Sequence, residues 1–333
     1  MTISSYLPEL ILKPLKPNNF VLILIGFFIL SAGVFSNANA QAAGTFENNL
    51  QPATSTQQVE FTDANGKILK FETSPRKIIS TSPAITEIIS YIGCADRLCG
   101  VTTLCDYPEE VKKIEKIGDV NLNYEKILQM KPDLIFVMKG LRNKESEILE
   151  SFGIKSFSVE LNSIDSILNS IELISQILRA PRGKSELCAS YKTLKNEIKK
   201  RQKSSIRSIY FEIWGDPPMS VGKASFMSEI IKAAHGINIF ADSEFENVSI
   251  SLEKVIEKNP EFIILAYPCK TSEIALRNGF GGLIAVKDSN VIAVDYNMYV
   301  RPGPRIFEAI LDLYNKLYSE NPILPETIFK SKK

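Results

Sequence analysis

A repeated segment constrains the fold of this 333-residue chain more than any other feature. The stretch LNYEKILQMKPDLIFV (122–137) aligns with ISLEKVIEKNPEFIIL (250–265) at an offset of 128 residues. Glu125 matches Glu253 in this alignment, and apolar positions fall on apolar positions. Each copy predicts a short helix that leads through a Pro-containing turn into a buried strand. We therefore expect the chain to hold two similar α/β lobes.

The segments around the repeat alternate between short β-branched runs and helical stretches. Strands are predicted at KIIST (77–81), LCGVT (98–102), LIFVM (134–138), SFSVE (156–160) and RSIYFEIW (207–214). Helices are predicted over 83–92, 124–130 and 144–152. This alternation is typical of βαβ units, so we expect an α/β fold of two Rossmann-like lobes with parallel central sheets.

The segment 163–204 has no strand signal and carries apolar residues at helical spacing. It predicts one or two long helices, with Pro181 as the point where a helix would break or kink. We expect this segment to act as a long backbone helix that joins an N-terminal lobe (76–162) to a C-terminal lobe (205–333).

The N-terminus reads as a targeting segment. Residues 20–35 are apolar and uncharged, two lysines precede them, and Asn37-Ala38-Asn39-Ala40 follows. This pattern predicts a signal peptide over 1–40 that is cleaved after Ala40, with an uncleaved membrane anchor as the alternative. Residues 41–75 then form a flexible lead-in and a β-hairpin around Asn65-Gly66. The sequence therefore predicts a periplasmic or other extracytoplasmic protein.

Charge and composition exclude several classes of function. Beyond residue 40 the chain carries 37 basic and 37 acidic residues, so no basic surplus indicates nucleic-acid binding. One histidine, His235, and no recognisable nucleophile motif argue against an enzyme, and we expect no catalytic residues, metal ligands or cofactor. An exported, neutral chain of two lobes with a cleft between them fits a monomeric receptor for a small solute.

Glu125 and Glu253 occupy matching positions near the start of the two repeated helices. Two lobes related by a pseudo-two-fold axis would present both carboxylates on one surface, where they could dock onto a two-fold symmetric partner. The alternative is that each carboxylate only favours its own helix N-terminus. The repeat alone supports both interpretations equally.

Several stretches resemble the periplasmic substrate-binding proteins of ABC importers for vitamin B12 and ferric siderophores. They are SPAITE (82–87), CDYPEE (105–110), NYEKILQMKPDLIF (123–136), DPPMSVGKASF (216–226), GINIFAD (236–242), SLEKVIEKNPEFII (251–264) and RPGPRIFEAI (301–310). The resemblance implies a receptor that captures cobalamin, or a related corrinoid, in the interlobe cleft and delivers it to an ABC permease dimer. It also implies that Glu125 and Glu253 dock onto permease arginines and that the stiff connector prevents large closure.

The resemblance implies a set of ligand-binding residues by position. They are Leu104, Asp106, Val120, Met138, Lys139, Ile213, Trp214, Met219, Asn297, Tyr299 and Arg301. Aromatic and Met side chains suit the apolar face of a corrin, and Arg or Asn suits its amides. Trp214, the only tryptophan, is the position we most expect at the ligand.

Other ligands and a sensor role remain alternatives. Ferric-siderophore receptors offer several cleft arginines, for which Arg301 and Arg142 are the candidates here, and a haem-type iron complex is a further alternative. A membrane-anchored sensor module is a third. The sequence leaves open the corrinoid or siderophore, its affinity, and the pairing of Cys94, Cys99, Cys105, Cys188 and Cys269.

Overall fold

The structure is a computed structural model that describes residues 58–201 and 205–329. The predicted signal peptide over 1–40, its cleavage after Ala40 and most of the lead-in lie outside the described residues. The helices in the described part of the chain include none that is both long enough and apolar enough to cross a membrane.

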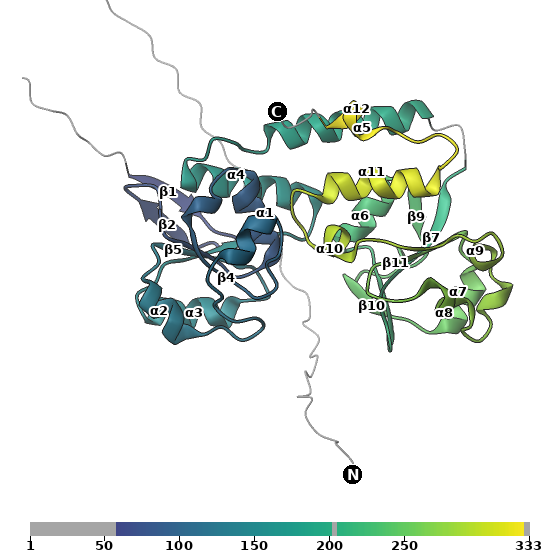
Figure 1. The fold of residues 1–333 in the computed structure, drawn as a ribbon, viewed down its shortest axis with the longest axis horizontal. Coiled ribbons are helices and arrows are strands. Elements are labelled where there is room, and N and C mark those ends of the chain that lie inside the picture. The colour runs from purple at the N-terminus through teal and green to yellow at the C-terminus, as the bar shows by residue number, and fades with distance from the viewer. Residues whose placement is uncertain (1–57, 202–204, 330–333) are drawn as a thin grey trace, which may run out of the picture. The chain divides into compact units, whose positions relative to one another are not determined.

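Lobe one is built on a parallel sheet with the strand order β4-β3-β5-β6. Strands β4 and β5 are labelled in Figure 1. Its strands are β3 (Ile78–Ser80), β4 (Leu98–Val101), β5 (Leu134–Met138) and β6 (Ser156–Val159). Its helices are α1 (Pro83–Tyr91), η1 (Ala95–Arg97), η2 (Glu109–Lys113), α2 (Tyr124–Met130) and α3 (Asn143–Ser151).

Lobe two has a mixed sheet in which β9-β7-β11-β12 are parallel neighbours and β8 and β10 add antiparallel pairing beside β7. Its strands are β7 (Arg207–Gly215), β8 (Pro218–Val221), β9 (Gly236–Asn238), β10 (Asn247–Ser249), β11 (Phe262–Leu265) and β12 (Val291–Ala293). Its helices are α6 (Phe226–Ala233), α7 (Leu252–Lys258), α8 (Thr271–Ala275), η3 (Phe280–Gly282), α9 (Ile284–Lys287), α10 (Tyr296–Val300), α11 (Ile306–Leu317) and α12 (Pro325–Ile328).

The two lobes repeat each other in local structure at the predicted offset. Helices α2 and α7 have seven residues each, and Asn123 and Ser251 cap them by accepting a backbone N–H. Both helices end at a left-handed residue, Lys131 or Asn259, and the strand begins three residues later. The strand order β9-β7-β11-β12 of lobe two also corresponds to β4-β3-β5-β6 of lobe one. The internal repeat is therefore structural as well as sequential.

Matching carboxylates tie each repeated strand to its neighbour. Asp133 Oδ2 accepts hydrogen bonds from the backbone N–H groups of Arg76 and Lys77, both at 2.8 Å, just before β3. Glu261, 128 positions later, accepts from the backbone N–H of Ser208 at 2.9 Å at the start of β7. Asp133 and Glu261 thus have the same role in the two repeats. Each fixes the backbone at the start of the first sheet strand of its lobe.

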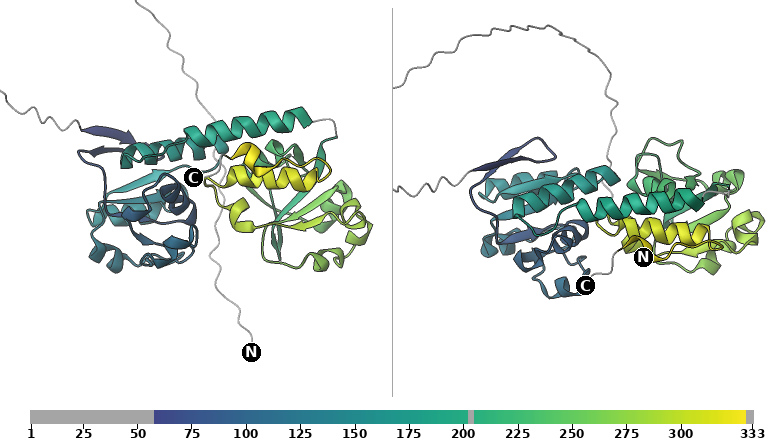
Figure 2. Two further views of the ribbon diagram at one scale, coloured as in Figure 1. Left: turned by 45° about the horizontal axis from the view of Figure 1, so that its top comes forward. Right: turned by 90° about the horizontal axis from the view of Figure 1, so that it is seen from above.

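The connector consists of two helices, α4 (Ile164–Leu178) and α5 (Ser185–Arg201), instead of a single long one (Figures 1 and 2). Ser163 caps α4 in a capping box, and Arg179 ends it in the left-handed conformation shortly before Pro181. Helix α4 packs on α1 of lobe one, and α5 packs on α11 and α12 of lobe two. The fold class expected from the sequence is confirmed, with this break as a refinement.

One apolar core runs through both lobes and the connector. It includes Phe136 of β5, Ile171 of α4, Leu194 of α5 and Phe211 of β7. The opposite face of each sheet has a smaller core of its own, which holds Ile135 in lobe one and Ile263 in lobe two. Both central strands are therefore buried on two faces, which explains their uninterrupted apolar sequences.

The hairpin expected around Asn65-Gly66 is present as β1 (Val59–Thr62) and β2 (Ile68–Phe71). Its connection is longer than the two residues expected, because Asp63 Oδ1 accepts from the backbone N–H groups of both Asn65 and Lys67. Asp63 Oδ2 also accepts from the backbone N–H of Ser158, which attaches the hairpin to β6.

Candidate ligand-binding site

A pocket of about 490 Å³ opens at the carboxyl ends of β7 and β11 in lobe two. Its lining consists of Trp214, Gly215, Asp216, Tyr267, Pro268, Cys269, Glu273, Ile274 and Arg277. Strand β7 has a parallel neighbour on each side, β9 on one and β11 on the other. The order in which the chain adds strands to the sheet therefore reverses at β7, which makes this a topological switch point. Open α/β sheets bind ligands at such a switch point, outside the carboxyl ends of the strands.

A fully buried carboxylate fixes the polar wall of this pocket. Glu212 of β7 accepts from both terminal nitrogens of Arg277, at 2.5 and 2.8 Å, and from the hydroxyl of Tyr210 at 2.5 Å. The hydroxyl of Tyr267 also donates to Glu212. Burial and the nearby Glu212 raise the pKa of Tyr267, so this phenol stays protonated at neutral pH.

Trp214 forms the apolar wall. Its side chain is 54% exposed, and its indole N–H donates to the backbone carbonyl of Asp216 at 2.8 Å. Because the one polar atom of the ring is already bonded within the chain, the faces of the indole are left for apolar contact. Met219 lies opposite Trp214 in the β7–β8 pairing, whereas Ile213 packs against the main core.

The lobe-one candidates divide into exposed and packed residues. Leu104 is 56% exposed and Val120 is 72% exposed. Met138 packs at the edge of the main core, and Lys139 pairs with Glu160 at 3.1 Å. Among the lobe-one candidates, Leu104 and Val120 are therefore the side chains that offer free apolar surface.

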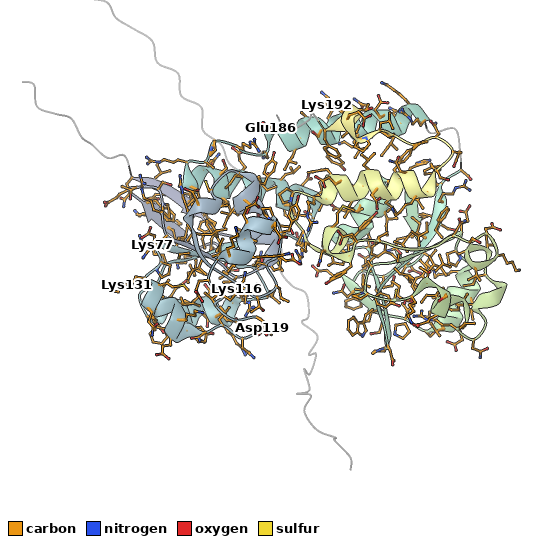
Figure 3. The ribbon with its side chains drawn as sticks, in the orientation of Figure 1. Lys77, Lys116, Asp119, Lys131, Glu186 and Lys192 are labelled. Carbon is orange, nitrogen blue, oxygen red and sulfur yellow. The ribbon has the colours of Figure 1, made fainter. Side chains whose placement is uncertain are left out.

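Arg142 is not the free cleft arginine that the siderophore alternative needs. It is buried and donates to the backbone carbonyls of Val120 at 2.5 Å and Asp119 at 2.7 Å. Its role is to hold the loop that precedes α2, where Asp119 is labelled in Figure 3. Gly118 in the same loop has a φ of +111°, and a Cβ there would lie 2.2 Å from the carbonyl oxygen of Asn121.

The candidates near α10 need one correction. Tyr299 is fully buried, its ring packs against Phe211, and its hydroxyl donates to Asp312 at 2.8 Å. It has no surface with which to touch a ligand, because residue 299 falls on the inner face of α10. Asn297 is half-buried on the same helix, and Arg301 follows it in ion pairs with Glu87 and Asp106.

Glu125 and Glu253 are both exposed, each in the first turn of its helix. The side-chain amide of Gln129 donates to Glu125 at 3.4 Å. In Figure 1, α2 and α7 lie on the lower side of their lobes, away from α4 and α5. The first turns already have Asn123 and Ser251 as caps, so these carboxylates are not needed to cap their helices.

The sequence as a whole matches a known family over the region just described. Residues 78–297, about two thirds of the chain, match the periplasmic binding proteins. This chain belongs to the periplasmic binding protein family.

Individual relatives of this binding protein are named as substrate-binding or vitamin B12-binding proteins. It is 29% identical to an ABC transporter substrate-binding lipoprotein of Bacillus subtilis over 88% of this chain and 96% of the relative. It is also 29% identical to the vitamin B12-binding protein of Vibrio cholerae over 70% of this chain and 86% of the relative.

Solved structures of the same kind resemble this binding protein. A possible iron-binding periplasmic solute-binding protein from Staphylococcus epidermidis superimposes with a TM-score of 0.65 at 30% identity, over 74% of this chain and all of the other. The vitamin B12-binding protein of Vibrio cholerae gives a TM-score of 0.62 at 26% identity, over 74% of this chain and 99% of the other.

The five cysteines of this binding protein carry free thiols. Cys94 and Cys99, which are near in sequence, are not paired, and Cys105 is buried beside the hydroxyls of Thr86 and Thr102. Cys269 lines the lobe-two pocket, where burial raises the pKa of its thiol. Among the described residues, no group of three or more His, Cys, Asp or Glu side chains is placed to hold a metal ion.

Sequence reasoning missed Tyr267, Arg277 and the buried Glu212. Tyr267 could have been found, because it follows the predicted strand FIIL and so falls at the carboxyl end of a parallel strand. Arg277 carried no such signal, since a loop and a short helix separate it from the strand that it serves.

Proposed function

We propose that this protein is a non-catalytic receptor that binds a cobalamin-type corrinoid between its lobes and delivers it to an ABC permease. The family membership supports a solute receptor, and relatives named as vitamin B12-binding proteins support a corrinoid. One observation carries the choice of ligand: the arginines around the site already pair with groups within the chain.

Each of these arginines forms ion pairs or hydrogen bonds with acceptors within the chain. Arg277 is bonded twice to Glu212, and Arg301 and Arg305 share Glu87. Arg142 donates to two backbone carbonyls and pairs with Glu145. An anionic ferric catecholate, or the carboxylates of a haem, would need guanidinium groups free to pair with them. A corrin needs apolar and aromatic surface for its face, and Trp214, Leu104 and Val120 supply such surface.

Haem-type binding has one observation in its favour, because Tyr267 and Cys269 are side chains of the kind that ligate haem iron and both line the pocket. The hydroxyl of Tyr267 is bonded to Glu212, however, and its raised pKa opposes the phenolate that would bind ferric iron. We therefore rank this alternative below a corrinoid.

The ligand is tested by mixing purified protein with cyanocobalamin, haemin or a ferric catecholate and passing each mixture through a desalting column. We expect the visible bands of cyanocobalamin to elute with the protein. Elution of haemin or the ferric catecholate with the protein, without cyanocobalamin, would contradict the proposal.

We also propose that Glu125 and Glu253 dock onto basic residues of the permease. The test is the double reversal Glu125→Arg and Glu253→Arg, measured as transport by the cognate importer in proteoliposomes. Uptake should be lost while ligand binding in solution is kept, because both side chains are exposed and lie outside the pocket lining. Glu257→Arg, at an exposed position near the other end of α7, is the matched control and should leave uptake intact. Equal losses of uptake and ligand binding in the double variant would show that the helices act structurally.

A further inference from the structure

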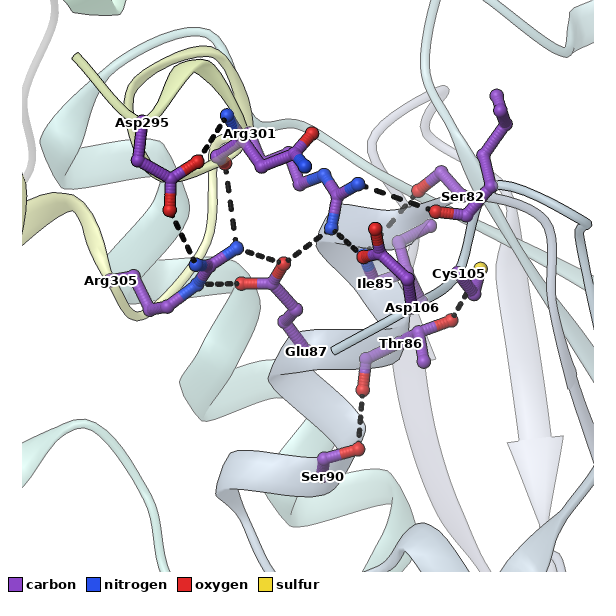
Figure 4. A network of polar contacts seen from close by, with 12 residues as sticks. Ser82, Ile85, Thr86, Glu87, Ser90, Cys105, Asp106, Asp295, Arg301 and Arg305 are labelled. Carbon is purple, nitrogen blue, oxygen red and sulfur yellow. Dashed lines mark hydrogen bonds and ion pairs between the residues drawn. The ribbon is translucent and has the colours of Figure 1, made fainter. Parts of the chain in front are cut away.

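A buried carboxylate joins the two lobes. Glu87 lies on α1 of lobe one, and only 2% of its side chain is exposed. It accepts hydrogen bonds from Arg301 Nη1 at 3.2 Å, from Arg305 Nη2 at 2.7 Å and from Arg305 Nε at 2.8 Å. Both arginines come from lobe two, between α10 and α11 (Figure 4). One carboxylate thus takes three charge-assisted hydrogen bonds from the other lobe.

The same two arginines also contact residues 104–107 of lobe one, a segment that is here named the 104–107 loop. Arg301 Nη1 donates to Asp106 Oδ1 at 2.5 Å, and its Nη2 donates to the carbonyl of Leu104 at 3.3 Å. The guanidinium carbon of Arg305 lies 4.1 Å from the centre of the Tyr107 ring, a cation–π contact. The loop that carries the candidates Leu104 and Asp106 is therefore held by lobe two.

The hold depends on the charge of Glu87. The side chains of Arg301 and Arg305 are 11% and 12% exposed, so water screens their mutual repulsion weakly. Asp106 and Asp295 also face the arginines, but their side chains are more than 40% exposed and contact only one guanidinium each. Glu87 alone bridges the pair, so removing its charge leaves two neighbouring guanidinium groups that repel each other.

We propose that Glu87 is a positioning residue. By holding Arg301 and Arg305 it fixes the 104–107 loop against lobe two, and the lobe-one rim of the ligand site is assembled before the ligand arrives. Preassembly raises affinity, because the binding step then carries no cost of ordering the loop. The effect on affinity rests on the proposed function, whereas the effect on the loop does not.

The effect of Glu87 on the 104–107 loop is tested without ligand, by hydrogen–deuterium exchange of peptides that cover residues 102–108. In Glu87→Gln we expect exchange to be about tenfold faster than in the unchanged protein. The control is Glu115→Gln, which removes an exposed ion pair with Lys126 in the same lobe and should leave the exchange unchanged. Unchanged exchange in Glu87→Gln would overturn the proposal.

A second variant separates loosening of the loop from loss of the fold. Asp106→Asn removes only the outer, partly exposed end of the cluster and leaves Glu87 paired with both arginines. Exchange over 102–108 should rise while the protein stays folded, with a urea midpoint only slightly below that of the unchanged protein. A stable Asp106→Asn protein with unchanged exchange would contradict the hold on the loop.

The ligand arm uses cyanocobalamin as the probe. Its dissociation constant should rise about tenfold in Glu87→Gln and stay the same in Glu115→Gln. Equal affinity in Glu87→Gln and the unchanged protein would overturn the role in binding. If the unchanged protein binds no cyanocobalamin but the loop still loosens in Glu87→Gln, the proposed ligand is wrong and the positioning role stands.

Discussion

Single residues decide the chemistry of this site through the partners that they already have. Arg142 and Arg301 look alike in sequence as candidate cleft cations, yet Arg142 is a buried loop holder and Arg301 is part of a bridge between the lobes. Tyr299 and Trp214 are both aromatic candidates, but one is fully buried and the other is largely exposed. These positions are candidates by residue type alone, and only their contacts in the structure show which of them can reach a ligand.

Replacing Trp214 by alanine should weaken ligand binding by about 1–3 kcal/mol, because an aromatic wall of the pocket is lost. The measurement is the affinity for cyanocobalamin by calorimetry, with Trp214→Phe as a control that should keep most of the binding. Unchanged affinity in a folded Trp214→Ala protein would place this residue outside the site.

The contact between Asp106 and Arg301 should respond to acid. The hydrogen bond from Arg301 lowers the pKa of Asp106 below its ordinary value, against a smaller rise from burial. Since the folded-state pKa is the lower one, the stabilisation is fully present above the ordinary Asp pKa of about 3.9 and is lost as the pH falls through the folded-state value. The difference in urea stability between the unchanged protein and Asp106→Asn should therefore stay constant from neutral pH to about pH 5 and then shrink. A difference that grows in acid would contradict this sign.

At the scale of elements, the sequence predicted the parts whose patterns are local. Helix α2 and strand β5 begin and end where their periodicity indicates, because Asn123 caps the helix and the strand is an unbroken apolar run. The β8–β10 pairing of lobe two escaped prediction, because it joins short segments that are far apart in sequence. The break between α4 and α5 was left open, since Pro181 permits either a kink or an end.

The central strand β5 should be highly sensitive to truncation. Phe136 is fully buried in the core that both lobes share, and its ring meets Phe157 edge-on at 6.0 Å. Phe136→Ala should lower the free energy of unfolding by about 3–5 kcal/mol, measured by urea denaturation. Phe152→Ala, at an exposed position just after α3, is the matched control and should cost far less. Similar losses in the two variants would argue against the shared core.

At the scale of the whole described molecule, the two lobes form one folding unit rather than two separate ones. The main core passes without interruption from lobe one through α4 and α5 into lobe two, and Glu87 adds an ionic bridge between the lobes. We therefore expect a single cooperative transition in calorimetry, with equal calorimetric and van't Hoff enthalpies. Two resolved transitions would show that the lobes unfold independently.

The central claim is that a corrinoid binds against Trp214, and the chain offers a direct reporter because this is its only tryptophan. The measurement is a titration of the protein with cyanocobalamin, followed by tryptophan fluorescence and corrected with free N-acetyltryptophanamide for light absorbed by the ligand. Saturable quenching that ends at one equivalent is the predicted result. Fluorescence that follows the free tryptophan control throughout, in a protein that is quenched by haemin or a ferric catecholate, would contradict the account.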